Sequence, residues 1–282
     1  MPGTLYVVST PIGNLDDITV RALDTLKSVG LVAAEDTRRT GLLLHHFGIA
    51  TPTTSLHEHN ESEKLPVLMR KLTEGVDIAL VSDAGTPVVA DPGQRLIAAA
   101  IQAGIRIVPI PGASAILAAL AASGYAADEF VFAGFAPSRS KDRKSWLARL
   151  LAEPRTVVFF ETPHRIQQTL AEMAELLGDR PIRVGRELTK LHESIVSSTA
   201  AQVSALNIPA RGEFTLVLGP YAVPAKEASP VTDKDLSDYF CQMTDSNNSS
   251  RRKALVATAD KFGLSPNEVY ARLERLKLSR PS

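Results

Sequence analysis

Short apolar runs alternate with amphipathic segments over the first part of the chain. Four of these runs predict buried strands, at residues 5–8, 31–34, 78–81 and 105–108. Leucine and valine at helical spacing predict helices between them, for example over 20–29 and 94–103, each followed by a glycine. Strands that alternate with helices are typical of a mostly parallel sheet.

A second series of strand and helix signals follows Gly124. Apolar runs predict strands at 130–132, 156–160, 182–185 and 214–218. Helices are predicted at 145–151 and 164–177. The pattern therefore predicts an α/β protein with two domains, residues 1–123 and 124–222.

The last part of the chain has a different pattern. Residues 221–230 are rich in proline and alanine, which predicts a linker. Residues 231–282 form a helical tail module, in which Ser265-Pro266-Asn267-Glu268 has the capping signature of a helix start. An earlier helix, about 250–262, ends at Gly263, so the module resembles a helix–turn–helix pair. The pattern favours a small packing module over a direct reader of nucleic acid.

Composition and charge narrow the class of protein. Of 282 residues, 44% are hydrophobic and 22% charged, which is ordinary for a soluble globular protein. The formal net charge is zero, so any surface that attracts nucleic acid must be local. Cys241 is the single cysteine, which fits a cytoplasmic protein without disulfides. The uncharged stretch 107–127 contains prolines and glycines, so we interpret it as strand, turn and helix and expect no membrane span.

Polar, turn-forming residues follow several predicted strands. The most informative stretch is 82–87 (Ser-Asp-Ala-Gly-Thr-Pro), directly after strand 78–81. Ligands of open α/β sheets bind outside the carboxyl ends of the strands, and Gly85 permits a close approach of the backbone. Thr-Pro steps also occur at 10–11 and 162–163. Together these residues predict one crevice that binds a small molecule.

Two further stretches have alternative interpretations. Residues 111–114 (Pro-Gly-Ala-Ser) could present backbone N–H groups to a ligand, or Ser114 could simply cap a helix. Residues 57–61 (His-Glu-His-Asn-Glu) have no distant His or Cys partner, so a loop that contacts substrate is favoured over a zinc site, and no metal is expected. Neither a P-loop nor a Gly-x-Gly-x-x-Gly after the first strand is present, which argues against a conventional nucleotide site.

Positive charge gathers in short stretches. Residues 36–39 (Asp-Thr-Arg-Arg) end a strand, where Arg38 could pair with Asp36 or hold a phosphate. Residues 138–144 (Ser-Arg-Ser-Lys-Asp-Arg-Lys) are the strongest basic patch, and 251–253 are a second one. Such patches can follow a phosphate backbone or be ordinary solvated loops, and we expect the first to contact RNA.

The motifs as an ordered set resemble one family. They are the stretches 9–15, 34–38, 57–61, 82–87, 161–165, 186–190 and 212–214. The set is similar to the RsmI family of small-subunit (16S) ribosomal RNA cytidine 2′-O-methyltransferases, in the tetrapyrrole methylase superfamily, over about residues 4–220. The resemblance implies a two-domain tetrapyrrole-methylase-like (class III methyltransferase) fold, S-adenosylmethionine (AdoMet) as cofactor, and a homodimer. Val88-Val89-Ala90 and residues 193–198 depart from the family pattern in loop detail.

The resemblance also implies roles for individual residues. The expected AdoMet contacts are Asp83, Gly85, Thr86, Ser114, Ala115, Phe160, Leu188 and Phe214. The RNA, expected within the small ribosomal subunit, would lie near Pro11, Asn14, Arg38 and Asn60. The basic patch would add Arg139, Lys141, Arg143 and Lys144.

A ribose hydroxyl needs a nearby base to become a good nucleophile. The candidates for this base are Asp36, His59 and Glu187, with Asp36 first because it ends a strand beside Arg38. Two other functions stay open. The same fold could methylate a tetrapyrrole such as a precorrin, although the basic patch speaks against it. Alternatively, the chain could be a non-catalytic nucleic-acid-binding module, which should bind no AdoMet.

Overall fold

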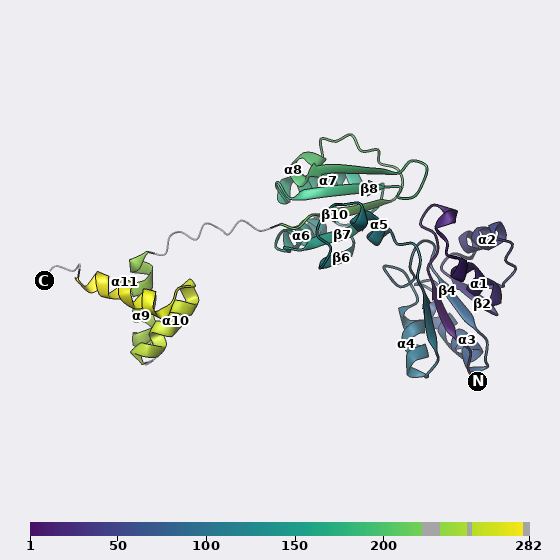
Figure 1. Cartoon of the computed structure of the whole chain (residues 1–282), viewed down its shortest axis with the longest axis horizontal. Coiled ribbons are helices and arrows are strands. Elements are labelled where there is room, and N and C mark those ends of the chain that lie inside the picture. The colour runs from purple at the N-terminus through teal and green to yellow at the C-terminus, as the bar shows by residue number, and fades with distance from the viewer. Residues whose placement is uncertain (222–231, 247–249, 279–282) are drawn as a thin grey trace. The chain divides into compact units, whose positions relative to one another are not determined.

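The computed structural model describes residues 1–221, 232–246 and 250–278. The chain divides into two compact units, Met1–Tyr221 and Ala222–Ser282. The predicted linker, 221–230, lies outside the described residues except for Tyr221. The larger unit contains two five-stranded sheets, which form two lobes (Figure 1).

The first sheet is parallel throughout, as the alternation of strands and helices predicts. Its strands are β1 (Leu5–Val8), β2 (Leu31–Ala34), β3 (Thr53–Ser55), β4 (Ile78–Val81) and β5 (Ile107–Ile110), in the order β3-β2-β4-β1-β5. The helices of this part are α1 (Val20–Ser28), α2 (Thr37–His46), α3 (Glu61–Thr73), α4 (Gln94–Gln102) and α5 (Ala115–Ala121), with a 3-10 turn, η1, at Leu15–Asp17.

Helices cover both faces of this sheet. Leu26 of α1 and Leu44 of α2 pack on one face, in the same cluster as Val32. Leu72 of α3 and Leu96 of α4 pack on the other face. Because both faces are buried, β4 is a continuous apolar run rather than an alternating one.

The second sheet is mixed. Its strands are β6 (Phe130–Phe135), β7 (Thr156–Glu161), β8 (Pro181–Arg186), β9 (Ser194–Thr199) and β10 (Phe214–Leu218), in the order β6-β7-β10-β8-β9. β6 is parallel to β7, whereas β10 is antiparallel to both of its neighbours and β9 is antiparallel to β8. The helices of this lobe are α6 (Ser140–Leu151), α7 (Ile166–Leu176) and α8 (Ala200–Val203).

Helix α5, from the first lobe, packs against the sheet of the second lobe. Ile116 and Leu120 on α5 belong to one buried cluster with Val158 of β7 and Val217 of β10. Ile12, from the loop after β1, is in the same cluster. The stretch 107–127 therefore forms a strand, a turn and a helix that supports the second sheet. The predicted domain boundary at 123/124 stays a prediction.

The smaller unit consists of α9 (Asp233–Ser246), α10 (Arg251–Phe262) and α11 (Pro266–Leu278). Its small core is made of Leu236, Ala259, Val269 and Leu273. At the start of α11, the Ser265 backbone N–H donates to Glu268 Oε2 at 2.8 Å and the Glu268 N–H donates to Ser265 Oγ at 3.3 Å. These are the two bonds of the predicted capping signature. Among the described residues of the chain, no helix is long and apolar enough to cross a bilayer.

Candidate active site

A cavity of about 790 Å³ lies between the two lobes, at the carboxyl ends of strands β1, β4, β5 and β7. We call it the main cavity. It is in the size range of small-molecule sites and at the sheet edge where ligands of α/β proteins bind. The eight residues predicted to contact AdoMet all line it: Asp83, Gly85, Thr86, Ser114, Ala115, Phe160, Leu188 and Phe214.

The loop after β4 is held against the loop after β1. Thr10 and Gly85 exchange backbone hydrogen bonds of 2.8 and 3.1 Å, and the Ser9 and Thr86 hydroxyls are 3.0 Å apart. Gly85 has a φ of +81°, and a Cβ there would lie 3.3 Å from Ile12 Cγ2. The structure thus joins the first two Thr-Pro steps, and Thr162 of the third lines the main cavity with Thr86.

Ser114 is the N-cap of α5. Its Oγ accepts a hydrogen bond of 3.4 Å from the Leu117 N–H. The capping interpretation of this serine is therefore realised, and the same residue also lines the main cavity.

Carboxylates outnumber cations in the lining of the main cavity. Glu35, Asp83 and Asp91 line it from the first lobe. Glu35 Oε2 accepts from the Asp83 N–H at 3.3 Å. Burial raises the pKa of Asp91 to about 6, and the negative charge of Glu35 adds to this shift. Burial also raises the pKa of Glu35.

Glu35 and Asp91 were not among the predicted site residues. Glu35 lies beside Asp36, whose arginine neighbour gives Asp36 the stronger sequence signal. Asp91 is carried by a loop in which Val88 and Ala90 have φ values of +74° and +66°. Backbone strain at non-glycine residues often accompanies a functional site, but only the structure reveals it. The Asp-Pro-Gly sequence at 91–93 was the available signal.

Phe132, Phe135 and Phe160 line the same cavity and form an aromatic wall. The rings of Phe132 and Phe135 lie 5.1 and 5.3 Å from the ring of Phe160. Leu188 and Phe214 are buried beside the main cavity. A flat apolar group can pack on such a wall while a cationic group faces the acids.

The structure places the three candidate bases outside the lining of the main cavity. Asp36 is the N-cap of α2, where its carboxylate accepts from the Arg38 N–H at 2.9 Å. The Arg38 guanidinium adds two bonds of 3.0 and 2.7 Å, and these contacts hold the pKa of Asp36 far below its usual range. His59 is exposed. Glu187 Oε1 accepts from Lys190 Nζ at 2.9 Å, which lowers the pKa of Glu187.

The four residues predicted near the RNA have distinct settings. Pro11 lines a second, smaller cavity next to the main one. Asn14 is exposed and caps η1 through its bond of 3.1 Å from the Asp16 N–H. Asn60 holds its own loop, accepting from the His57 N–H at 2.8 Å and donating to Ser55 Oγ at 2.9 Å. The Arg38 side chain is 88% exposed.

The basic patch divides into two kinds of residue. Arg139, Lys141 and Lys144 are exposed, and Lys144 pairs with Glu175 at 2.8 Å. Arg143, by contrast, is fully buried and pairs with Glu172 at 2.6 Å. It also donates to the carbonyls of residues 137 and 138. The prediction that Arg143 contacts RNA is therefore corrected: its guanidinium fixes the start of α6 and has no exposed surface.

No metal centre is formed by the part of the chain that the structure describes. There, no group of three or more His, Cys, Asp or Glu side chains could hold a metal ion.

Comparison with known proteins gives consistent relatives. The model of the family Tetrapyrrole (Corrin/Porphyrin) Methylases matches residues 4–204. A Haemophilus influenzae protein named ribosomal RNA small subunit methyltransferase I is 45% identical over 277 residues, covering 96% of each chain. A Synechocystis protein of the same name is 50% identical over 220 residues, covering 77% of this chain and 78% of that one.

Solved structures share the fold at low identity. A diphthine synthase is 17% identical with a TM-score of 0.62, over 77% of this chain and 90% of the other. A uroporphyrin-III-C-methyltransferase from Thermus thermophilus is 20% identical with a TM-score of 0.54, over 77% and 94%. Both likenesses concern the fold alone.

Proposed function

Since this chain belongs to the tetrapyrrole methylase family, and within it to the small-subunit ribosomal RNA methyltransferases I, we propose that it methylates a ribose 2′-hydroxyl of a cytidine in 16S ribosomal RNA. Its cofactor is AdoMet. One observation carries the proposal at the site: the eight residues expected to contact AdoMet line one cavity between the lobes.

The lining of the main cavity fits AdoMet chemically. AdoMet carries a sulfonium and an ammonium, and at the first lobe the cavity offers three carboxylates, Glu35, Asp83 and Asp91. Arg39 is the one cation among the residues that line it. The aromatic wall around Phe160 suits the adenine ring. When bound, AdoMet supplies an electrophilic methyl group.

The residues of the chain must position the ribose hydroxyl in line with this methyl group, and positioning provides much of the rate. We propose that Asp36 accepts the hydroxyl proton, with His59 and Glu187 as alternatives. Arg38 now holds Asp36 in a form that is a poor base. Because the Arg38 side chain is 88% exposed, an RNA phosphate can draw it away, which would return Asp36 towards its ordinary basicity.

Asp36→Asn tests this role in single-turnover methylation. We expect a rate lower by about 10²–10⁴-fold, with AdoMet affinity unchanged. Unchanged turnover would remove Asp36 from the role, and a loss of AdoMet affinity would assign it to cofactor binding. Arg38→Gln is the matched variant. It should weaken RNA binding more than it lowers the rate of methylation in the complex with RNA bound.

The proposed RNA contacts lie outside the lining of the main cavity. Pro11, Asn14, Arg38 and Asn60 would contact the RNA near the target, and the exposed Arg139, Lys141 and Lys144 would follow its backbone. A ribose hydroxyl reaches a cleft only if its nucleotide is splayed out of the RNA. We propose that the substrate is the small ribosomal subunit, so that the protein acts in the cytoplasm.

The organisation of the chain belongs to the same proposal. Residues 1–123 and 124–222 would act as two domains on either side of the main cavity, with 231–282 as a helical module. The working form would be a homodimer. Light scattering of the purified protein tests the last point, since a mass near 30.3 kDa would identify a monomer.

A competition between substrates separates the proposed function from its alternatives. Protein and labelled AdoMet are incubated with small subunits, naked ribosomal RNA and a precorrin. We expect label in the RNA of the subunits. Label in the precorrin would favour a tetrapyrrole methyltransferase. A protein that binds no AdoMet would be a non-catalytic nucleic-acid-binding module.

A further inference from the structure

Two smaller cavities adjoin the main one. The second cavity, about 290 Å³, shares five lining residues with it: Ile12, Arg39, Asp83, Ala84 and Glu213. The third, about 510 Å³, shares Ile12, Pro111, Gly112 and Ser114 with it. RNA is a polymer, so the nucleotides next to one that enters the main cavity must lie on an adjoining surface. Arg39 and Lys190 line the second cavity together with Asp83 and Glu213, whereas the described lining of the third has Asp17 and no lysine or arginine, so of these two cavities only the second offers cations to a phosphate.

We propose that the second cavity binds a nucleotide adjacent to the methylated one, with its phosphate between Arg39 and Lys190 and its base against Leu15 and Leu42. This subsite rests on the proposed function, because it assumes an RNA substrate. It is formed by both lobes: Arg39 and Leu42 lie on α2, Leu15 begins η1, and Lys190 follows β8.

Both cations keep hydrogen-bonding capacity for a phosphate. The Arg39 side chain is 64% exposed, and its ion pair with Asp83 is long, at 3.4 Å. A guanidinium has five N–H donors, so this contact leaves most of them available. Lys190 Nζ donates to Glu187 Oε1 at 2.9 Å and to Glu213 Oε2 at 3.1 Å. These bonds hold the ammonium in place and use two of its three donors.

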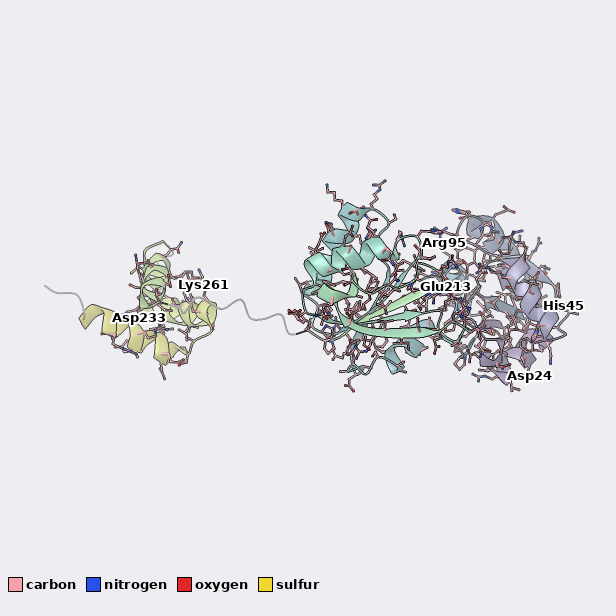
Figure 2. The ribbon with its side chains drawn as sticks, turned by 90° about the horizontal axis from the view of Figure 1, so that it is seen from above. Asp24, His45, Arg95, Glu213, Asp233 and Lys261 are labelled. Atoms are coloured by element: carbon pink, nitrogen blue, oxygen red, sulfur yellow. The ribbon has the colours of Figure 1, made fainter. Side chains whose placement is uncertain are left out.

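The backbone at Gly13 and around Leu188 allows the Lys190 side chain to reach this position. A Cβ on Gly13 would lie 2.4 Å from Lys190 Cγ, so glycine at 13 leaves room for the lysine stem to cross from the second lobe to the first. Glu187 and Thr189 on either side of Leu188 have φ values of +52° and +67°. Figure 2 labels Glu213, the second partner of the lysine, where the two lobes meet. The motif 186–190 thus has a structural purpose that AdoMet binding alone does not explain.

The third cavity lacks these features. Among the described residues that line it there is no lysine or arginine, and Asp17 is its charged residue. A phosphodiester would meet an unpaired negative charge there. The second cavity also borders apolar surface, since Leu42 is 74% and Leu15 39% exposed. Exposed leucines beside a cavity are a suitable surface for the face of a base.

The test is the salt dependence of RNA binding by the full chain. The dissociation constant for small ribosomal subunits, the proposed substrate, is measured by co-sedimentation at several KCl concentrations, for wild type, Lys190→Gln and Arg39→Gln. Each substitution should weaken binding about tenfold at low salt, the loss of one charge-assisted contact. Each should also reduce the slope of log K against log salt by about one. Lys190→Gln should leave the AdoMet dissociation constant within about twofold.

Two further variants separate a charge effect from a structural one. Lys190→Arg keeps the charge and should keep the wild-type salt slope. Arg70→Gln removes an exposed cation of α3 that lines none of the three cavities, and it should bind RNA as wild type does. An unchanged slope for Lys190→Gln, or a Lys190→Arg protein as weak as Lys190→Gln, would overturn the subsite. If wild type methylates no 16S RNA, the proposed function fails instead.

Discussion

Individual acidic residues in and around the main cavity owe their chemistry to their surroundings more than to their type. Asp36 and Asp91 are both aspartates of the first lobe. Hydrogen bonds from the guanidinium and the backbone N–H of Arg38 keep the pKa of Asp36 low, whereas burial near Glu35 raises that of Asp91. Sequence could locate the acids at strand ends, but it could not show which of them would be paired and which desolvated. For the same reason, Asp91 is not among the predicted site residues, and Arg143 is wrongly predicted to contact RNA.

Asp91→Asn should change the pH dependence of stability. Because the pKa of Asp91 is raised from 3.8 to about 6, the folded protein keeps a proton that the unfolded chain loses between these values. The contribution of this group to stability is therefore present below pH 4 and lost as the pH rises to 6. The asparagine variant should gain stability relative to wild type across this window and keep the gain above it.

Urea unfolding without AdoMet, at pH values from 4 to 8, measures this difference. AdoMet is left out because a bound cation would stabilise the ionised carboxylate. A difference between the two proteins that does not vary with pH would contradict the assignment.

Arg143→Met should destabilise the fold strongly. The substitution leaves the carboxylate of Glu172 buried without its partner, which typically costs about 3–5 kcal/mol. Lys144→Met breaks an exposed pair with Glu175 on the same two helices, which water and salt screen, and should change the stability far less. Chemical denaturation compares the two variants, and equal losses would contradict the buried role of Arg143.

At the scale of elements, strongly apolar segments could be predicted and weakly patterned ones could not. The runs at 5–8, 31–34 and 78–81 coincide with β1, β2 and β4. β9 was missed because it is an edge strand whose half-buried residues are mostly serine and threonine. The chain pattern predicts a helix that begins at Thr40, whereas α2 begins at Thr37, because Asp36, interpreted above as a functional acid, is the N-cap of this helix. A capping side chain and a strand-end catalyst have the same sequence signal.

Gly85→Ala should damage the loop between β4 and the main cavity. An alanine at a φ of +81° costs about 1–2 kcal/mol, and its Cβ would press on Ile12 at 3.3 Å. We expect both lower stability and weaker AdoMet binding, measured by thermal unfolding and calorimetry. Gly41→Ala is the control: it lies within α2 with no atom within 4 Å of the added Cβ, so stability should be unchanged or higher.

At the scale of the whole molecule, the motifs were sufficient to predict two lobes with a cleft between them. The parallel first sheet follows from its alternation of strands and helices. The mixed order of the second sheet does not, because apolar runs carry no information on strand direction. The role of α5 could not be predicted either, since its packing on β7 and β10 depends on contacts distant in sequence. The tail module was predicted as helical, but α9 was not separately recognised.

A fragment of residues 1–221 should bind AdoMet as the full chain does. Every residue that lines the main cavity lies in this compact unit. Calorimetry should give dissociation constants for fragment and full chain that agree within about twofold. A folded fragment that has lost AdoMet affinity would show that the helical module takes part in the site.

We propose above that this enzyme methylates the 2′-oxygen of a cytidine in 16S ribosomal RNA. The most direct measurement incubates the protein with small subunits that lack the modification and with methyl-labelled AdoMet, then digests the RNA to nucleosides for mass spectrometry. We expect label in 2′-O-methylcytidine, and its loss with Asp83→Asn, whose carboxylate lines the main cavity. Label in a base-methylated nucleoside, or no label in the RNA while AdoMet is bound, would contradict it.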